Sequence, residues 1–440
     1  MSGLANCRLR SARRPHRCRP ASSRWKSPAT RRGTIIIKQL RYLGKWSLLA
    51  TLVAVAAGSA SAFFLVALDV ATAWREAYRW VVWLLPLAGF AVGWIYLHIG
   101  SHVEAGNNLL IDEIHDPKKV VPLRLAPLIL CSTVVSHLFG ASVGREGTAV
   151  QMGGALADQL THVFRLHRED RSTVLMAGIS AGFASVFGTP LAGAIFGLEV
   201  LVVGRMRLAA IYPCMLAAVL ADQVTRWWGV GHTHYPAGPL GAPDGPLALS
   251  LAAIVVAGVI FGLVGRAFAA ATHSLSAWFK ARFAYAPLRP LVGGFVIAAV
   301  VGLSSFDLHR YLGLGIGPMV EAFRVPLDWW DWLGKFVFTV GSLGAGFKGG
   351  EVTPLFNIGA TLGNALAPIL HLPFPLLAAI GFVAVFAGAA NTPLACTVMA
   401  MELFGPAVGP YAALACVVAF MFSGQQGIYR AQRQPSSEHP

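Results

Sequence analysis

Charged side chains are scarce in this 440-residue sequence: Asp, Glu, Lys and Arg together make up 12% of it, about half of what a soluble domain carries. Hydrophobic residues reach 55%, and the mean hydropathy is +0.61. This balance excludes an ordinary soluble globular protein and predicts an all-α polytopic membrane protein. Apolar runs recur, some long enough to span a bilayer and others too short: 46–68, 80–99, 125–138, 247–265, 291–303 and 375–390.

Clustered cysteines and catalytic motifs are also missing. The six cysteines are scattered without metal-ligand spacing, and four lie in apolar segments, so they are interpreted as small buried residues. No nucleophile triad, metal cluster or nucleotide-binding loop appears, which disfavours an enzyme or a receptor and predicts neither cofactor nor metal. His232 and His234 form an HxH pair in a Gly/Pro/His-rich loop. Because no third ligand is nearby, a solvated loop is favoured there over a metal site.

Acidic residues are absent before Asp69, whereas residues 1–45 hold 13 of the 35 Lys and Arg residues. The net charge of +15 therefore leaves about +2 for the rest of the chain. We interpret residues 1–35 as a disordered, basic cytoplasmic tail that follows the positive-inside rule. A nucleic-acid-binding tail is disfavoured because aromatic residues are not interleaved with the basic ones. A secretory signal is excluded, while a transit peptide or an over-extended start stays an alternative.

Four short motifs form two pairs whose members are about 205 residues apart. They are GREGT at 144–148 with GEVTP at 350–354, and TPLAG at 189–193 with TPLAC at 392–396. Glu199 and Glu402 each follow ten residues after the Thr of the second pair. The pairs predict a duplicated membrane protein with repeats at 40–204 and 247–434, joined by a connecting helix and loop at 205–246. Matching, broken apolar segments indicate a transport site between the repeats.

Each motif predicts the start of a helix. Thr suits the N-cap position and Pro the first helical position, so Thr148, Thr189, Thr353 and Thr392 are predicted N-caps. A helix N-terminus exposes about four unpaired N–H groups and about half a positive charge. Several such ends aimed at one point form an anion site, and Gly147 lets the backbone approach the ion. Thr189 and Thr392, taken alone, are better interpreted as simple helix starts.

Small residues also recur at a spacing that permits close helix contact, at Gly178 and Gly182 and again at Gly359 and Gly363.

Glu146 is the sharpest candidate for function, because a carboxylate at membrane depth costs about 3 kcal/mol. Before a helix start it would compete with an anion and, once protonated, release the site. The alternative is a salt bridge with a cation such as Arg145.

The run GREG at 144–147 resembles the gating-glutamate motif of the CLC chloride channel and transporter family. Residues 177–199 and 381–402 resemble that family's paired repeat helices, and the similarity extends in the family's order from about residue 40. The resemblance implies a homodimer with an inverted-topology repeat of short, broken and tilted helices. It also implies a separate ion pathway in each subunit, with Glu146 as the gate.

Departures from the usual CLC motifs point to one branch. The stretch GNNL at 106–109 replaces a Ser-containing turn, Thr148 replaces a Pro, and GEVTP at 350–354 is unusual. Together they resemble the CLC-F fluoride/proton antiporters, which implies export of fluoride from the cytoplasm in exchange for protons. A chloride/proton exchanger or chloride channel of the same fold is the alternative. The resemblance further implies a bacterial inner-membrane protein with both termini in the cytoplasm and no nucleic-acid partner.

The resemblance, together with hydrogen-bonding capacity, defines the candidate site. Fluoride needs close donors to replace its water, which an Asn amide and a Thr hydroxyl supply. Anion binding is predicted for Gly106, Asn107, Asn108, Gly147, Glu351, Val352, Thr353 and Tyr429. Asn107 has the alternative of capping or interhelical bonding, and Tyr429 that of an interfacial tyrosine.

The inner proton route is less well defined. Glu199 and Glu351 are its candidates, because Val200 stands where many chloride/proton exchangers carry a Glu. Water, or movement of protonated Glu146, is an alternative route. Glu351 itself is expected to bind a proton or a cation, or to pair with Lys348, and these alternatives stay open.

Overall fold

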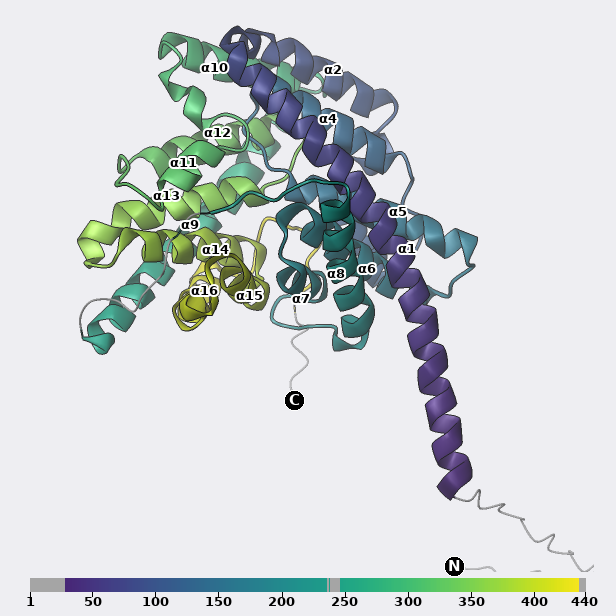
Figure 1. Cartoon of the computed structure of the whole chain (residues 1–440). Coiled ribbons are helices and arrows are strands. Elements are labelled where there is room, and N and C mark those ends of the chain that lie inside the picture. The colour runs from purple at the N-terminus through teal and green to yellow at the C-terminus, as the bar shows by residue number, and fades with distance from the viewer. Residues whose placement is uncertain (1–27, 236, 238–245, 435–440) are drawn as a thin grey trace, which may run out of the picture. The chain divides into compact units, whose positions relative to one another are not determined.

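The computed structural model describes residues 28–235, 237 and 246–434, and it is built from helices (Figure 1). These described residues contain no β-strand, only isolated bridges. The α-helices are α1 Pro28–Ala77, α2 Leu85–His98, α3 Asn107–His115, α4 Leu125–Phe139, α5 Glu146–Val163, α6 Arg168–Phe187, α7 Pro190–Glu199, α8 Ile211–Trp227, α9 Leu247–Arg282, α10 Leu288–Leu303, α11 Ile316–Glu321, α12 Asp331–Ala345, α13 Val352–Leu370, α14 Phe374–Ala390, α15 Pro393–Phe404 and α16 Gly409–Ser423. The 3₁₀ turns are η1 Arg79–Leu84, η2 Ser101–Val103, η3 Leu208–Ala210, η4 Asp307–Tyr311 and η5 Pro406–Val408.

The chain divides into two units, Met1–Lys45 and Trp46–Pro440. Most of the first unit, up to residue 27, lies outside the described residues, and so does most of the predicted basic tail at 1–35. From Pro28 the backbone is already helical, so the last part of that predicted tail is the start of α1. The second unit holds the rest of α1, the later helices and the candidate site.

Among the described residues, five helical segments are long and apolar enough to cross a membrane: Ile37–Ala77, Arg79–His98, Leu208–Trp227, Leu247–Arg282 and Pro406–Ser423. Other apolar helices are shorter, with 10–17 residues, among them α4, α7, α10, α14 and α15. A helix needs about 20 residues to span the hydrocarbon core, so these shorter helices cannot cross it alone. Helix ends inside a membrane are tolerated where protein surrounds them.

Glycines bring two helix pairs into close contact. In α6, a Cβ on Gly182 would lie 2.3 Å from the carbonyl oxygen of Ala149 in α5. In α13, a Cβ on Gly359 would lie 2.0 Å from the carbonyl oxygen of Gly381 in α14, and one on Gly363 would lie 2.2 Å from that of Leu377. The predicted small-residue contacts are therefore confirmed, and each pair includes a helix that begins at a GREG or GEVT turn.

The acids that follow the TPLA motifs cap each other's helices. Glu199, at the end of α7, accepts hydrogen bonds from the N–H groups of Leu394 (3.0 Å) and Ala395 (2.8 Å) at the start of α15. Glu402 of α15 accepts from Leu191 (2.9 Å) and Ala192 (2.8 Å) at the start of α7. A carboxylate at a helix N-terminus is favoured by both the free N–H groups and the helix dipole. This exchange joins two segments about 200 residues apart.

Thr189 and Thr392 occupy the predicted N-cap positions, and each is followed by Pro at the first helical position. Neither side chain makes the capping hydrogen bond, however. The exchanged carboxylates take that role because they reach two N–H groups at once.

Replacing Glu199 by Gln is expected to lower the stability of the folded protein by about 2–3 kcal/mol, because charged hydrogen bonds are replaced by a neutral one and one N–H group is left unbonded. Thermal unfolding in detergent, monitored by the loss of monodisperse protein, measures this. Glu169→Gln is the control, since Glu169 is exposed in the first turn of α6, and its melting temperature should stay near that of the wild type. Equal melting temperatures for both variants would contradict the capping role.

Candidate functional site

The two glycine turns of the repeats meet. Gly350 N–H donates to the carbonyl of Gly144 (2.8 Å), and Gly144 N–H donates back to the carbonyl of Gly350. This antiparallel bridge places the starts of α5 and α13 side by side. The predicted anion site at the meeting point of two helix N-termini therefore has a structural basis.

The helix starts differ from the prediction in one respect. Thr148 and Thr353 were expected to be N-caps, but α5 begins at Glu146 and α13 begins at Val352, so both threonines lie inside the first turn. The Thr148 hydroxyl bonds to that of Thr133 in α4 (2.8 Å). The bridge between the glycine turns lets each helix begin a few residues before the position that a Thr cap would set. The Thr353 hydroxyl is therefore free to bond to another partner.

That partner is Glu146. Its Oε2 accepts a hydrogen bond from the N–H of Thr353 (3.1 Å) and a short one from the Thr353 hydroxyl. Its Oε1 lies 3.3 Å from Nε of Arg145. The carboxylate is fully buried, so these bonds replace the water that it has lost. Glu146 thus sits at the N-terminus of α13 and also forms the alternative salt bridge.

The side chains of Asn107 and Glu351 both lie close to Gly147. A Cβ placed on Gly147 would lie 3.2 Å from Nδ2 of Asn107, 3.6 Å from Oε2 of Glu351 and 2.9 Å from the Cα of Gly350. Asn107 is the first residue of α3, after Gly106 in a positive-φ conformation (φ 57°). Oδ1 of Asn107 and Oε2 of Glu351 are buried and have no hydrogen-bond partner among the described residues. Unsatisfied buried polar atoms of this kind are rare and mark a place for a proton, water or ion.

A cavity of about 580 Å³ opens beside these groups. Asn107, Glu351 and Tyr429 all line it. Its charged lining residues are the cations Lys280, Arg289, Lys348 and Arg430, with His273 beside them, and the two acids Glu104 and Glu351. A hollow lined by several cations raises the local concentration of anions.

Tyr429 and Asn108 belong to the C-terminal side of this cavity. Tyr429 is buried and also lines a void of about 10 Å³ that it shares with Asn107 and Val150. Oδ1 of Asn108 accepts a hydrogen bond from the N–H of Ala431 (3.0 Å). Asn108 therefore holds the Tyr429 segment against the start of α3, while Asn107 faces the site.

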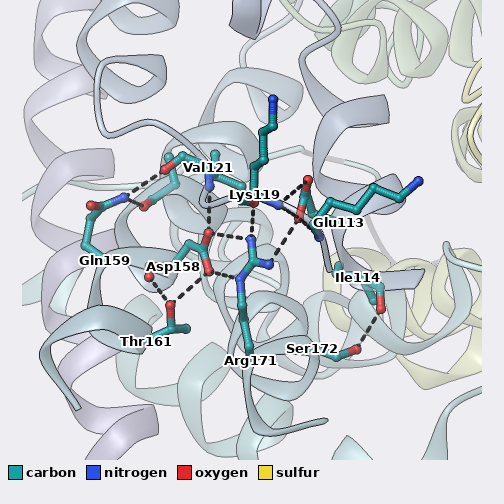
Figure 2. Close-up of polar contacts among 11 residues, drawn as sticks. Glu113, Ile114, Lys119, Val121, Asp158, Gln159, Thr161, Arg171 and Ser172 are labelled. Atoms are coloured by element: carbon teal, nitrogen blue, oxygen red, sulfur yellow. Dashed lines mark hydrogen bonds and ion pairs between the residues drawn. The ribbon is translucent and has the colours of Figure 1, made fainter. Parts of the chain in front are cut away.

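A buried ion network, which the sequence did not reveal, holds the far end of α3 (Figure 2). Arg171 of α6 pairs with Glu113 of α3 (3.1 Å) and with Asp158 of α5 (2.7 Å). The same carboxylates accept N–H groups of the α3–α4 loop, from Lys118 to Glu113 (3.0 Å) and from Val121 to Asp158 (2.7 Å). A network with its donors and acceptors matched favours one packing arrangement. It therefore fixes α3, and with it Asn107, against α5.

With this geometry in view, the model of the voltage gated chloride channel family matches residues 88–424. The chain belongs to this family. It also resembles a protein named "Chloride/fluoride channel protein" from Pseudomonas syringae pv. tomato, at 66% identity over 91% of this chain and 89% of the relative. An "H(+)/Cl(-) exchange transporter ClcA" from Cronobacter sakazakii is 27% identical over 81% of each chain. The chain is thus an integral membrane anion transporter, as the motifs predicted.

Solved structures agree with the CLC-type fold. A CLC-type fluoride/proton antiporter superposes with a TM-score of 0.85 at 35% identity, covering 89% of this chain and 98% of the other. A slow cyanobacterial Cl⁻/H⁺ antiporter superposes with a TM-score of 0.76 at 22% identity, over 87% and 96% of the two chains. The predicted fold class and family resemblance are therefore confirmed.

The remaining site predictions fall into two groups. Gly106, Asn107, Gly147, Glu351, Val352 and Thr353 gather around the two glycine turns, and Tyr429 joins them through the cavity. Glu199 instead uses both oxygens as the α15 cap, so its proton-route role stays a prediction. Lys348 lies 4.0 Å from Glu104 and over the Tyr96 ring (4.3 Å), rather than in an ion pair with Glu351.

Proposed function

We propose that this protein exports fluoride from the cytoplasm in exchange for protons, with Glu146 as a gate that competes with the anion. The observation that carries this proposal is the Glu146 carboxylate at the N-terminus of α13, where it takes the N–H and hydroxyl of Thr353. Those donors suit any small anion. The Glu146 carboxylate and a free anion would use the same donors, so they cannot occupy this position at the same time.

Protonation of Glu146 then couples the two fluxes. The neutral acid is a weaker acceptor than the carboxylate, so it leaves the Thr353 donors, and fluoride takes its place. When Glu146 gives up its proton, the carboxylate returns and displaces the ion. Each swing of the side chain therefore moves one proton against the anion.

The donors suit a small, strongly hydrated ion. Fluoride has about the size of a water molecule, and the void beside Asn107 and Tyr429, of about 10 Å³, is near the smallest space that holds one water. The Asn107 amide lines this void, and the Thr353 hydroxyl supplies a second donor at the start of α13. The names of a relative and of a structural neighbour both contain the word "fluoride", which also favours fluoride as the transported ion.

The cation-lined cavity is assigned to the cytoplasmic side, where it gathers the anion before export. Glu351 lines this cavity and lies near Gly147, so it is the proposed proton carrier between the cavity and the gate. Because Glu199 is engaged as a helix cap, Glu351 is the better placed of the two predicted acids. In keeping with the family resemblance, we place the protein in the bacterial inner membrane as a homodimer with both termini cytoplasmic.

Purified protein in liposomes with an outward fluoride gradient and an internal pH probe tests this function. The expected result is fluoride efflux with uphill proton entry, and chloride efflux slower by at least about tenfold, since a preference of about 1.4 kcal/mol gives that ratio. Equal fluoride and chloride fluxes would contradict the fluoride assignment and favour a chloride/proton exchanger. Anion flux without proton movement would contradict antiport and favour a channel.

A further inference from the structure

The HxH pair of the sequence lies in a segment that reaches the gate. Residues 229–235, here named the strap, follow α8, and Figure 1 shows the chain crossing there from α8 toward the α13 side of the fold. His232 anchors the strap through Nε2, which lies 3.0 Å from Oδ1 of the buried Asp222 of α8. The ring rests on Gly188 (φ 75°), where a Cβ would lie 2.5 Å from the imidazole. A side chain at position 188 would displace His232, so this glycine is part of the anchor.

Tyr235 anchors the other end of the strap. Its ring is buried and packs edge-on against Phe382 of α14 (5.1 Å between ring centres). Phe382 stacks in turn on Phe356 of α13 (4.3 Å, 7° between planes). Aromatic contacts of this kind contribute about 0.5–1.5 kcal/mol each beyond area burial. The strap is therefore fixed on both sides, one end to α8 and the other to α14, which stacks on the helix that carries Thr353.

Between the two anchors, Thr233 meets the residue beside the gate. Its Oγ1 accepts a hydrogen bond from Nη2 of Arg145 (3.1 Å), while Nε of the same guanidinium lies 3.3 Å from Oε1 of Glu146. Arg145 is 5% exposed. Within the described part of the chain, these are its two side-chain partners. The cation is thus shared between a fixed hydroxyl and a movable carboxylate.

We propose that Thr233 is a positioning residue, which keeps the Arg145 guanidinium beside the site when Glu146 is protonated and swings away. This inference rests on the proposed function of Glu146. A buried cation that loses its carboxylate partner is strongly destabilised unless another polar group holds it. The strap supplies that group, and its hydroxyl also limits how tightly Arg145 pairs with the deprotonated gate. Thr233 thereby sets how readily Glu146 takes up a proton.

Other charged and titratable groups face this pair from the elements around it. They are His137 of α4, Tyr235 of the strap, Glu351 before α13 and Tyr429 near the C-terminus, with Arg75 and Lys335 next to His137. Among the described residues, none of them forms a hydrogen bond with the Arg145 guanidinium. Removing the Thr233 hydroxyl therefore takes away the one side-chain partner that Arg145 has besides Glu146 in the described chain.

The experiment compares the pH profile of fluoride/proton exchange in liposomes for wild type and Thr233→Val. Without the hydroxyl, Arg145 pairs with Glu146 alone and holds it deprotonated, so the pH of half-maximal transport should fall by about 0.5 to 1 unit, the equivalent of about one hydrogen bond. Thr233→Ser restores the hydroxyl and should restore the wild-type profile. His234→Ala is the matched control, because that neighbouring side chain is exposed, and its profile should be unchanged.

A double-mutant cycle separates positioning from general damage to the fold. Combined with Glu146→Gln, which is expected to retain fluoride binding, Thr233→Val should leave the fluoride affinity measured by calorimetry unchanged, whereas general damage to the fold would lower it. If Thr233→Val does not yield folded protein, Thr233→Ala is measured in its place, because Thr233 is only half-buried. Wild-type exchange with unshifted Thr233→Val and Thr233→Ala profiles would overturn the strap inference and leave the function standing. Absence of coupled exchange in the wild type would instead refute the function.

Discussion

Glu146→Gln should reduce proton movement coupled to fluoride to the level of protein-free liposomes. The amide has nearly the shape of the carboxylate, and its oxygen can still accept from Thr353. It cannot gain or lose a proton at working pH, so the exchange of charge that drives the cycle is lost. Fluoride binding should persist, because the N-terminal donors of α13 are unchanged. Coupled flux in liposomes and fluoride binding by calorimetry measure the two effects separately.

Glu169→Gln serves as the control for this measurement, since it also removes one carboxylate but from an exposed position. It should retain wild-type coupling. Full proton-coupled flux in Glu146→Gln would mean that another group carries the proton, and Glu351 would then be the first to examine. Loss of fluoride binding together with coupling would instead mean that Glu146 builds the site rather than competing for it.

The two repeats use equivalent helix starts for unequal purposes. Glu146 is the first residue of α5, and its carboxylate crosses to the N-terminus of α13. Glu351 precedes α13, but its Oε2 has no hydrogen-bond partner in the described chain and lines the cavity instead. A free donor set beside Thr353 therefore exists only when the Glu146 side chain leaves it. We infer that the GREG turn supplies the moving part and the GEVT turn the fixed part.

The sequence was a sound guide to the repeated elements. The regular spacing of the TPLA motifs predicted the starts of α7 and α15, and the small-residue spacing at Gly178 and Gly359 predicted close helix contacts. These features depend on local backbone chemistry, which a sequence carries directly. The choice of fluoride, in contrast, came from the resemblance, because hydrogen-bonding capacity alone does not separate fluoride from chloride.

Two features that the sequence missed join distant segments of the chain. Thr353 was predicted to be an N-cap, but the bridge between Gly144 and Gly350 starts its helix earlier. The reciprocal capping by Glu199 and Glu402 spans 195 to 211 residues. Only the equal ten-residue distance from each Thr to its acid hinted at it. Contacts of this kind depend on which turns the fold brings together, and no local pattern encodes that.

Gly359→Ala tests whether the close helix contact supports the site. The new Cβ would lie 2.0 Å from the carbonyl oxygen and 2.6 Å from the carbonyl carbon of Gly381. Both atoms belong to the backbone, so no side chain can rotate away, and α13 must separate from α14. Overpacking of this kind costs about 3 kcal/mol or more. We expect a lower melting temperature in detergent and little folded protein.

The matched control is Gly341→Ala in α12, where an added Cβ meets no atom within 4 Å. Its stability should equal or slightly exceed that of the wild type, because Ala favours a helix over Gly by about 1 kcal/mol. Gly182→Ala, the corresponding change in α6, should behave like Gly359→Ala, since its Cβ would lie 2.3 Å from the carbonyl oxygen of Ala149. If either variant melts like the control, that helix pair can separate without loss. The first turn of α5 or α13 would then not depend on this packing for its place in the site.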